Sequence, residues 1–233
     1  MNSELDNVVE IPELRNMTRI FRDRIHAGEV LADMLISFKD SKSIVLGIPA
    51  GGVPVAAPVA LKLNLVLDVA VVSKITLPWN TEAGYGAVAF DGTVRLNTDV
   101  VSQIGLTDDQ IKNGVEKALN KVQRRFKEFR GAKLFPVTRK HNIILVDDGI
   151  ASGFTMLVAV EALKKIGTNK IIVAVPTAHL QSLDLMAPEV NRIFCANIRG
   201  GWGFAVADAY KNWYDVDEQE VIEILKNYNL YFS

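Results

Sequence analysis

Short apolar runs alternate with helical periods along this chain. The runs are rich in β-branched residues and are continuous rather than alternating, which is typical of strands covered on both faces. They lie at Ile44–Ile48, Leu67–Val72, Ile143–Val146, Ile171–Val175 and, more weakly, Arg192–Ala196. The alternation predicts an α/β fold with a mainly parallel sheet.

Helices are predicted between these runs, where apolar positions recur every three or four residues. The clearest covers Ile111–Phe129, with Thr107 at its start and Gly131 past its end. Similar periods cover Ile25–Phe38 and Met156–Ile166.

One insertion interrupts the alternation. Tyr85–Phe90 and Thr93–Asn97 flank Asp91-Gly92, which predicts a β-hairpin. The chain shows no fixed repeat and no low-complexity linker, so we expect a single domain over residues 1–233. Its aromatic-rich end, about 199–233, is expected to form a small hood over the sheet edge.

Composition narrows the class of protein. The chain has 233 residues, 49% of them apolar and 23% charged, with a net charge of −1. These values exclude a disordered chain, a collagen-like repeat and a disulfide scaffold. A balanced charge gives no electrostatic reason to expect nucleic acid or an anionic membrane as partner. The single cysteine, Cys195, permits no internal disulfide, which suits a reducing compartment.

A membrane segment is not expected. Residues 44–61 carry no charge, but Pro49, Pro54 and Pro58 and three glycines divide the stretch into a strand, a turn and the start of a helix. The first ten residues are polar and acidic, unlike a secretory signal. We therefore expect a cytoplasmic protein.

The motif with the clearest chemistry is LVDDGIASGFTM, at residues 145–156. An apolar strand ends in two carboxylates, Asp147 and Asp148; a loop of small residues follows, and then a helix begins. Converging backbone N–H groups and a helix N-terminus form a site for an anion, to which Ser152 and Thr155 can add hydroxyl donors. The aspartates suit ribose hydroxyls, or a divalent cation acting through water. Together these features predict a sugar phosphate as ligand.

This run closely resembles the phosphoribosyl pyrophosphate (PRPP) signature of type I phosphoribosyltransferases. The resemblance implies the Rossmann-like parallel sheet core of that family. It also implies that Asp147 and Asp148 contact the ribose hydroxyls. The 5′-phosphate would lie in the loop that the following residues form: Gly149, Ala151, Ser152, Gly153, Phe154 and Thr155.

Three further junctions fit the same resemblance. Ala50, Gly51 and Gly52 stand where the family has its pyrophosphate-binding loop, although a plain strand–helix turn is the alternative. Lys74 directly follows an apolar run, where it can neutralise pyrophosphate or simply be solvated. Thr76 to Gly86 matches the position of the family's flexible catalytic loop, or is an ordinary exposed turn.

The similarity spans most of the chain and extends to Phe21-Arg22-Asp23-Arg24 and to Phe204–Asp217. It implies transfer of ribose 5-phosphate from PRPP to a nitrogen acceptor, with release of pyrophosphate. Mg²⁺ would be the cofactor, held mainly through PRPP rather than by direct protein ligands. Family members are often homodimers, and we expect one here.

The acceptor is the least defined part of this prediction. Hypoxanthine-guanine enzymes carry an aspartate where this chain has Ala151, which argues against that specificity. Catalytic roles fall to Asp147, Asp148 and Lys74, with Glu82 as the candidate proton acceptor. Trp202, Phe204, Tyr210 and Trp213 are expected to cluster under the hood. Trp202 and Phe204 are candidates to stack on the acceptor, and the alternative is that the aromatics form the core of the hood.

Other functions fit less well. A non-catalytic regulator that senses PRPP or a nucleotide on the same fold is the main alternative. A dinucleotide oxidoreductase lacks Gly-x-Gly-x-x-Gly after the first strand, and a P-loop ATPase lacks its Gly-Lys-Ser/Thr ending. The three histidines show no metal-ligand spacing.

Overall fold

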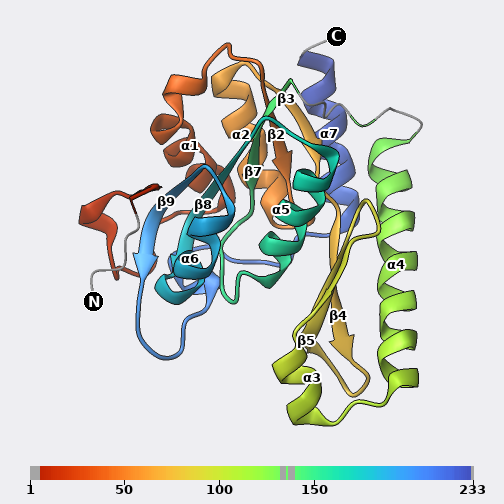
Figure 1. Cartoon of the computed structure of the whole chain (residues 1–233). Coiled ribbons are helices and arrows are strands. Elements are labelled where there is room, and N and C mark those ends of the chain that lie inside the picture. Colours follow the sequence, from red (N-terminus) through yellow and green to blue (C-terminus); the bar gives the residue numbers. More distant parts are fainter. Residues whose placement is uncertain (1–5, 132–134, 136–139, 232–233) are drawn as a thin grey trace.

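The computed structural model of the chain describes residues 6–131, 135 and 140–231. Within these residues, six parallel strands form the central sheet, in the order β1-β9-β8-β7-β2-β3 (Figure 1). Their bounds are β1 Val8–Val9, β2 Ser43–Gly47, β3 Val66–Val69, β7 Asn142–Val146, β8 Lys170–His179 and β9 Arg192–Arg199. The predicted α/β class with a parallel sheet is confirmed.

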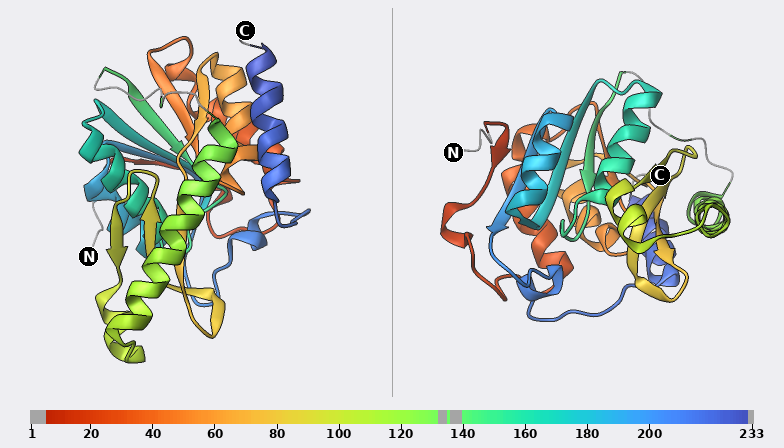
Figure 2. Two further views of the ribbon diagram at one scale, coloured as in Figure 1. Left: turned by 90° about the vertical axis from the view of Figure 1, so that its right-hand side faces the viewer. Right: turned by 60° about the horizontal axis from the view of Figure 1, so that its bottom comes forward.

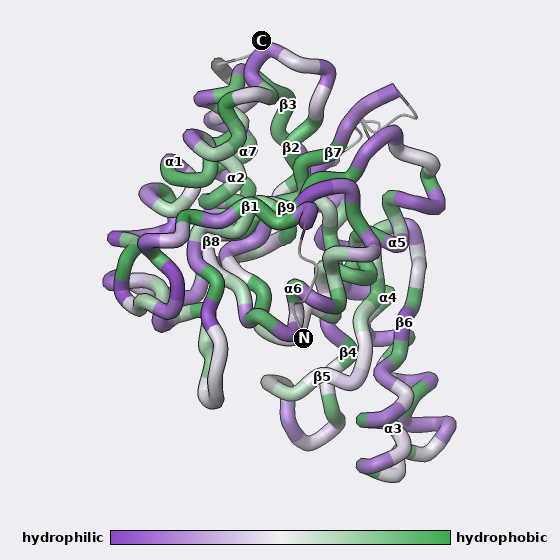
Figure 3. The backbone as a smooth tube through the Cα atoms, turned by 60° about the vertical axis from the view of Figure 1, so that its left-hand side comes forward, coloured by the Kyte–Doolittle hydropathy of each residue, from purple (hydrophilic) through white to green (hydrophobic). Residues whose placement is uncertain are grey.

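The continuous apolar runs are explained by burial on both faces of this sheet. Val45 and Ile144 face one hydrophobic core, and Leu46 and Leu145 face the other. Successive strand residues point to opposite faces, so a strand covered on both sides needs apolar residues at every position. The tube through β2 and β7 is accordingly mostly hydrophobic in Figure 3.

Helices cover the two faces separately. On one face, α1 (Arg24–Met34) packs against α2 (Gly52–Leu63), and both contact the sheet. Side chains of α5 (Phe154–Ile166) and α6 (Leu180–Met186) belong to the core on the other face. The α5 helix ends at Gly167, whose φ of 81° is the left-handed conformation that favours glycine.

A second, antiparallel sheet stands beside the first (Figure 2). It consists of β4 (Val72–Leu77), β5 (Asn80–Ala89) and β6 (Val94–Leu96), and α3 (Thr98–Ile104) and α4 (Asp108–Arg130) follow it. The hairpin predicted at Asp91-Gly92 is present between β5 and β6. The long α4 packs along β4 and β5.

Two local predictions in this region are wrong. The apolar run Leu67–Val72 does not form one strand, because β3 ends at Val69 and Val72 begins β4 in the other sheet. The loop expected over Thr76–Gly86 is largely the paired strands β4 and β5, joined at Pro78-Trp79. Pairing across the two segments, such as Ile75 with Gly86, satisfies backbone groups that a loop would leave to water.

The C-terminal part runs across the molecule instead of gathering into one cover. Residues 200–210 follow β9, where Phe21 forms a bridge with Tyr210. The last helix, α7 (Glu218–Tyr231), packs against α2, α4 and β3. The short helical turns are η1 Pro12–Leu14, η2 Ile36–Phe38, η3 Ala187–Glu189 and η4 Val206–Ala209. Among the described helices, none has the length and apolarity needed to cross a membrane.

Candidate active site

The candidate site lies where the connections of the central sheet diverge. From β2 the chain continues to β3 on one side, and from β7 it continues to β8 and β9 on the other. Gly47 and Val146 are paired neighbours at the carboxyl ends of β2 and β7, and Ile48 N–H donates to the Val146 carbonyl at 2.8 Å. Parallel sheets bind ligands at such a switch point, outside the carboxyl ends of the strands. The loops after β2 and β7 therefore share one edge.

The base of the loop after β7 is anchored by hydrogen bonds to neighbouring elements. Ile150 N–H donates to the Thr177 carbonyl, and His179 N–H donates to the Ile150 carbonyl, both at 2.9 Å. Ser182 Oγ donates to the carbonyl of Ala151. These bonds fix the base of the loop on β8 and α6, while Ala151 and Ser152 stay exposed.

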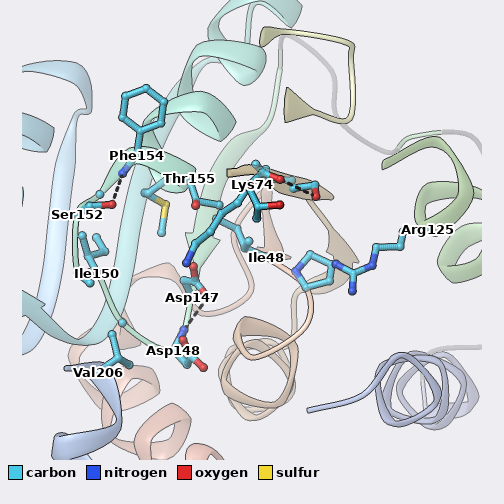
Figure 4. A pocket seen from close by; sticks show the side chains of 18 of the residues that line it. Ile48, Lys74, Arg125, Asp147, Asp148, Ile150, Ser152, Phe154, Thr155 and Val206 are labelled. Carbon is cyan, nitrogen blue, oxygen red and sulfur yellow. Dashed lines mark hydrogen bonds between the residues drawn. The ribbon is translucent and has the colours of Figure 1, made fainter. Parts of the chain in front are cut away.

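A cavity of about 390 Å³ opens beside this loop (Figure 4). Residues 147–156 line one side of it, and Ile48, Pro49 and Lys74 line another. Gly153, with φ of 75°, turns the chain into α5, whose first backbone N–H groups have no intrahelical partner. The side chain of Ser152 accepts a bond from Phe154 N–H at 3.4 Å. The arrangement offers amide and hydroxyl donors to an anion.

The two aspartates lie at the base of this cavity. Asp147 accepts a hydrogen bond from the backbone N–H of Asp148 at 2.9 Å. Burial raises the pKa of Asp147 well above its ordinary value, and the charge of Asp148 raises it further. Burial also raises the pKa of Asp148, against the opposing effect of Arg24. Cations or hydroxyl donors that reach the pair would therefore stabilise its ionised form.

Arg24, in the first turn of α1, is the cationic partner of this pair. Its Nε donates to Asp148 Oδ2 at 2.9 Å, and its side chain is only 4% exposed. A second donor reaches the Tyr214 carbonyl at 2.7 Å, and the guanidinium lies 3.9 Å from the ring centre of Trp213. Tyr210 Oη donates to the Asp148 carbonyl at 2.6 Å. The backbone and side chain of Asp148 are thus both fixed.

Glycines allow the two loops to meet. A Cβ atom at Gly51 would lie 2.0 Å from Oδ2 of Asp148, and one at Gly52 would lie 2.7 Å from the Val146 carbonyl oxygen. Neither distance is possible for a side chain, so the glycines are required by the close approach of the two loops.

The comparisons with known proteins agree with this geometry. A family model described as the phosphoribosyl transferase domain matches residues 20–209. The chain belongs to the phosphoribosyltransferase family. The match begins just before Arg24 and includes both loops of the site, so the predicted family is confirmed.

Two named relatives come from Mycobacterium tuberculosis, strains CDC 1551 and H37Rv. Each is called "Putative phosphoribosyl transferase" and is 37% identical over 209 residues, which is 89% of this chain. The match covers 46% of each relative, so this chain spans about half of their length. Among solved structures, TT1426 from Thermus thermophilus is 29% identical, with a TM-score of 0.69. That alignment covers 89% of this chain and 98% of TT1426.

Lys74 is exposed and belongs to β4 of the second sheet, not to the end of a central strand. Its side chain nevertheless extends toward Asp147 in Figure 4. Its charge lowers the pKa values of both aspartates, although less than burial raises them. Glu82 is in β5, and its side chain lies outside the described part of the structure.

The predicted aromatic cluster is divided into two groups. Tyr210 and Trp213 pack together, with ring centres 5.2 Å apart, beside Arg24. Phe204 instead contacts His179, and Trp202 is fully exposed. Trp202 and Phe204 line a separate hollow of about 460 Å³, which shares Ala151 with the central cavity.

Sequence reasoning missed three cationic residues of the site. Arg24 has its partner 124 positions away, and no local pattern indicates that contact. Lys121 and Arg125, from α4, line the cavity opposite the loop after β7. Their spacing of four residues indicates that they share one face of a helix, but the sequence does not show that this face lies against the cavity.

Proposed function

We propose that this protein transfers ribose 5-phosphate from PRPP to a nitrogen nucleophile and releases pyrophosphate. One observation carries the proposal. The loop after β7, with its aspartate pair, and Ile48-Pro49 at the carboxyl end of β2 line a single cavity that includes Lys74, and Gly51 packs directly against Asp148 behind them. A ligand with a phosphate at one end, a ribose in the middle and a pyrophosphate at the other end fits that order of groups.

Each part of PRPP has a matching set of residues. The 5′-phosphate would accept hydrogen bonds from the backbone and hydroxyl donors of Ala151–Thr155 at the start of α5. The ribose hydroxyls would donate to Asp147 and Asp148. The pyrophosphate would lie on the backbone amides of Ala50 and Gly51, with Lys74 beside it as a compact positive charge, because the Gly52 N–H already donates to the Ile48 carbonyl at 3.0 Å.

The reaction needs positioning and charge stabilisation more than covalent chemistry. The bond from C1 to the pyrophosphate oxygen breaks, a bond from C1 to the acceptor nitrogen forms, and the proton of that nitrogen passes to a base, for which Glu82 is the candidate taken from the sequence. Positive charge develops on the ribose near the carboxylates, and negative charge develops on pyrophosphate near Lys74. Arg24 acts as a positioning residue, because its bond to Asp148 orients that carboxylate and favours its ionised form.

Mg²⁺ fits this site as a cofactor held mostly by substrate. Asp147 and Asp148 are oxygen donors of the kind that Mg²⁺ prefers, either directly or through water. In the described residues, no group of three or more His, Cys, Asp or Glu side chains could hold a metal ion. When bound, Mg²⁺ would neutralise charge on the leaving pyrophosphate.

The acceptor is proposed to bind near Trp202 and Phe204. Their hollow adjoins the central cavity at Ala151. Phe204 presents an aromatic surface already bracketed by His179 and Arg199, and an exposed Trp202 is free to pack on a planar ring.

The test is release of pyrophosphate from PRPP with Mg²⁺ and a panel of nitrogenous bases. We expect turnover with at least one base, and a loss of about 100-fold or more in Asp148→Asn, because the ribose and Arg24 both lose their anionic partner. Asp184→Asn, at an exposed position in α6, is the matched control and should retain full activity.

Other outcomes distinguish the alternatives. PRPP binding by calorimetry without pyrophosphate release for any base would favour the non-catalytic regulator. Absence of PRPP binding altogether would overturn the proposal.

A further inference from the structure

A second hollow continues from the central cavity, between the β4–β5 hairpin and α4. Its volume is about 380 Å³. The two spaces share Ser73, Lys74, Thr76 and Lys121, so the groove begins at the lysine assigned above to the leaving group. We call this space the α4 groove; Leu77, Pro78, Gln110, Asn113, Gly114, Lys117 and Ala118 complete its lining.

The α4 groove is lined by cations and lacks anions. Lys117, Lys121 and Arg125 are spaced by four residues, which places them on one stripe of α4 facing this space and the cavity. Successive members are about 6 Å apart along the helix axis, from four residues at a rise of 1.5 Å each. Among the described residues, no carboxylate lines the groove.

Within the described residues, the three lysines that line the groove form no ion pair with a carboxylate. Arg125 pairs with Glu218 at 2.6 Å, but Lys74, Lys117 and Lys121 form no ion pair with any described residue. Partial burial lowers the pKa of Lys121, and the charges of Arg125 and Arg124 lower it further, against the opposing charge of Glu218. Like charges four residues apart destabilise a helix, so an anion in the groove would relieve an existing repulsion.

The remaining lining narrows the class of anion. Gln110, Asn113 and Thr76 supply polar contacts, and none of the described lining residues is aromatic and able to stack on a base. A single phosphate would reach only one or two of cations spaced in this way. A chain of phosphates can follow them from Lys74 outward.

We propose that the α4 groove binds linear condensed phosphates, as an extension of the pyrophosphate position. The assignment of its inner end rests on the proposed function. Tripolyphosphate should bind more tightly than pyrophosphate, and pyrophosphate more tightly than orthophosphate, because each added phosphate meets a further cation. Condensed phosphates would then compete with PRPP for Lys74 and regulate the transferase.

The experiment is calorimetric titration of the whole protein with tripolyphosphate at low ionic strength, where exposed charges are least screened. We expect Lys117→Ala and Lys121→Ala each to weaken binding about fivefold. Lys112→Ala is the matched control, because it removes an exposed lysine of the same helix that does not line the groove, and it should change affinity less than twofold. Circular dichroism checks that each variant is folded.

The inference is overturned if tripolyphosphate binds no more tightly than orthophosphate. It is equally overturned if Lys112→Ala weakens binding as much as Lys117→Ala does. PRPP titrated in parallel separates the two proposals. PRPP binding without lysine-dependent tripolyphosphate binding rejects only the groove, whereas the reverse pattern supports the groove and rejects the transferase assignment.

Discussion

Asp147 occupies a position where its own charge is unfavourable in the free protein. Burial and the adjacent Asp148 both disfavour its ionised form, and Arg24, the cation with the larger effect on it, is bonded to Asp148 instead. Functional sites often hold groups in this condition, because the stabilisation is supplied by the ligand. A ribose hydroxyl or a cation at Asp147 would provide it.

Replacement of Asp147 by Asn should therefore stabilise the free protein in a pH-dependent way. The pKa of Asp147 is raised in the fold, so the folded state binds its proton more tightly than the unfolded state. Wild-type stability is then lost as pH rises from the ordinary carboxyl range through the raised pKa. Urea unfolding should show the advantage of Asp147→Asn growing with pH, while PRPP affinity falls about tenfold.

Asp184→Asn is the control for both measurements and should show neither effect. An Asp147→Asn variant that is less stable than wild type at high pH would contradict the origin assigned to the shift.

At the scale of elements, α4 shows how much local sequence specifies. Thr107 and Gln110 form a reciprocal capping box, and Gly131 ends the helix, as its pattern predicts. The apolar stripe of α4 includes Ala118, Val122 and Phe129, which are buried.

By contrast, α6 and α7 were not predicted, and only the beginning of α2 was predicted. Three prolines in and around α2 obscured its period, although Pro54 is in the first turn and Pro58 is accommodated within the helix.

Glu218 joins α7 to α4. It accepts bonds from Arg124 and Arg125, and these bonds lower its pKa to about 2. We expect Glu218→Gln to lower the free energy of unfolding by about 0.5–1 kcal/mol at neutral pH, a modest value because the pair is partly exposed. Since the pKa is depressed, the contribution is present above about 4.5 and is lost as pH falls toward about 2.

Urea unfolding at several pH values measures this difference. Glu223→Gln, on the same helix but without an arginine partner among the described residues, is the control. A constant difference between Glu218→Gln and wild type down to pH 2 would show that the loss is not electrostatic.

At the scale of the whole molecule, the site depends on the order of strands. Placing β2 beside β7 brings the loop at Gly51 against Asp148, although the two are far apart in the chain. We expect Gly51→Ala to reduce PRPP affinity about tenfold or more, because its Cβ would displace the Asp148 carboxylate from its bond to Arg24. Calorimetric titration with PRPP measures the effect. Gly200→Ala is the control, since no heavy atom lies within 4 Å of its added Cβ. Wild-type affinity in Gly51→Ala would show that PRPP binding does not require this close approach.

The sequence by itself determined the elements and motifs that are local in origin. Strand runs, helix caps, the Asp91-Gly92 turn and the strand–loop–helix at 142–156 depend on residues within a few positions of one another, so periodicity and turn chemistry reveal them. Only the tertiary structure decided which of these parts meet. It split the run at Val69, paired Thr76–Gly86 into a hairpin, separated Trp202 from Trp213, and brought Arg24 to Asp148 and Lys121 to the cavity. Those outcomes depend on burying both faces of the sheet and on the neighbours each strand acquires, which no local pattern encodes.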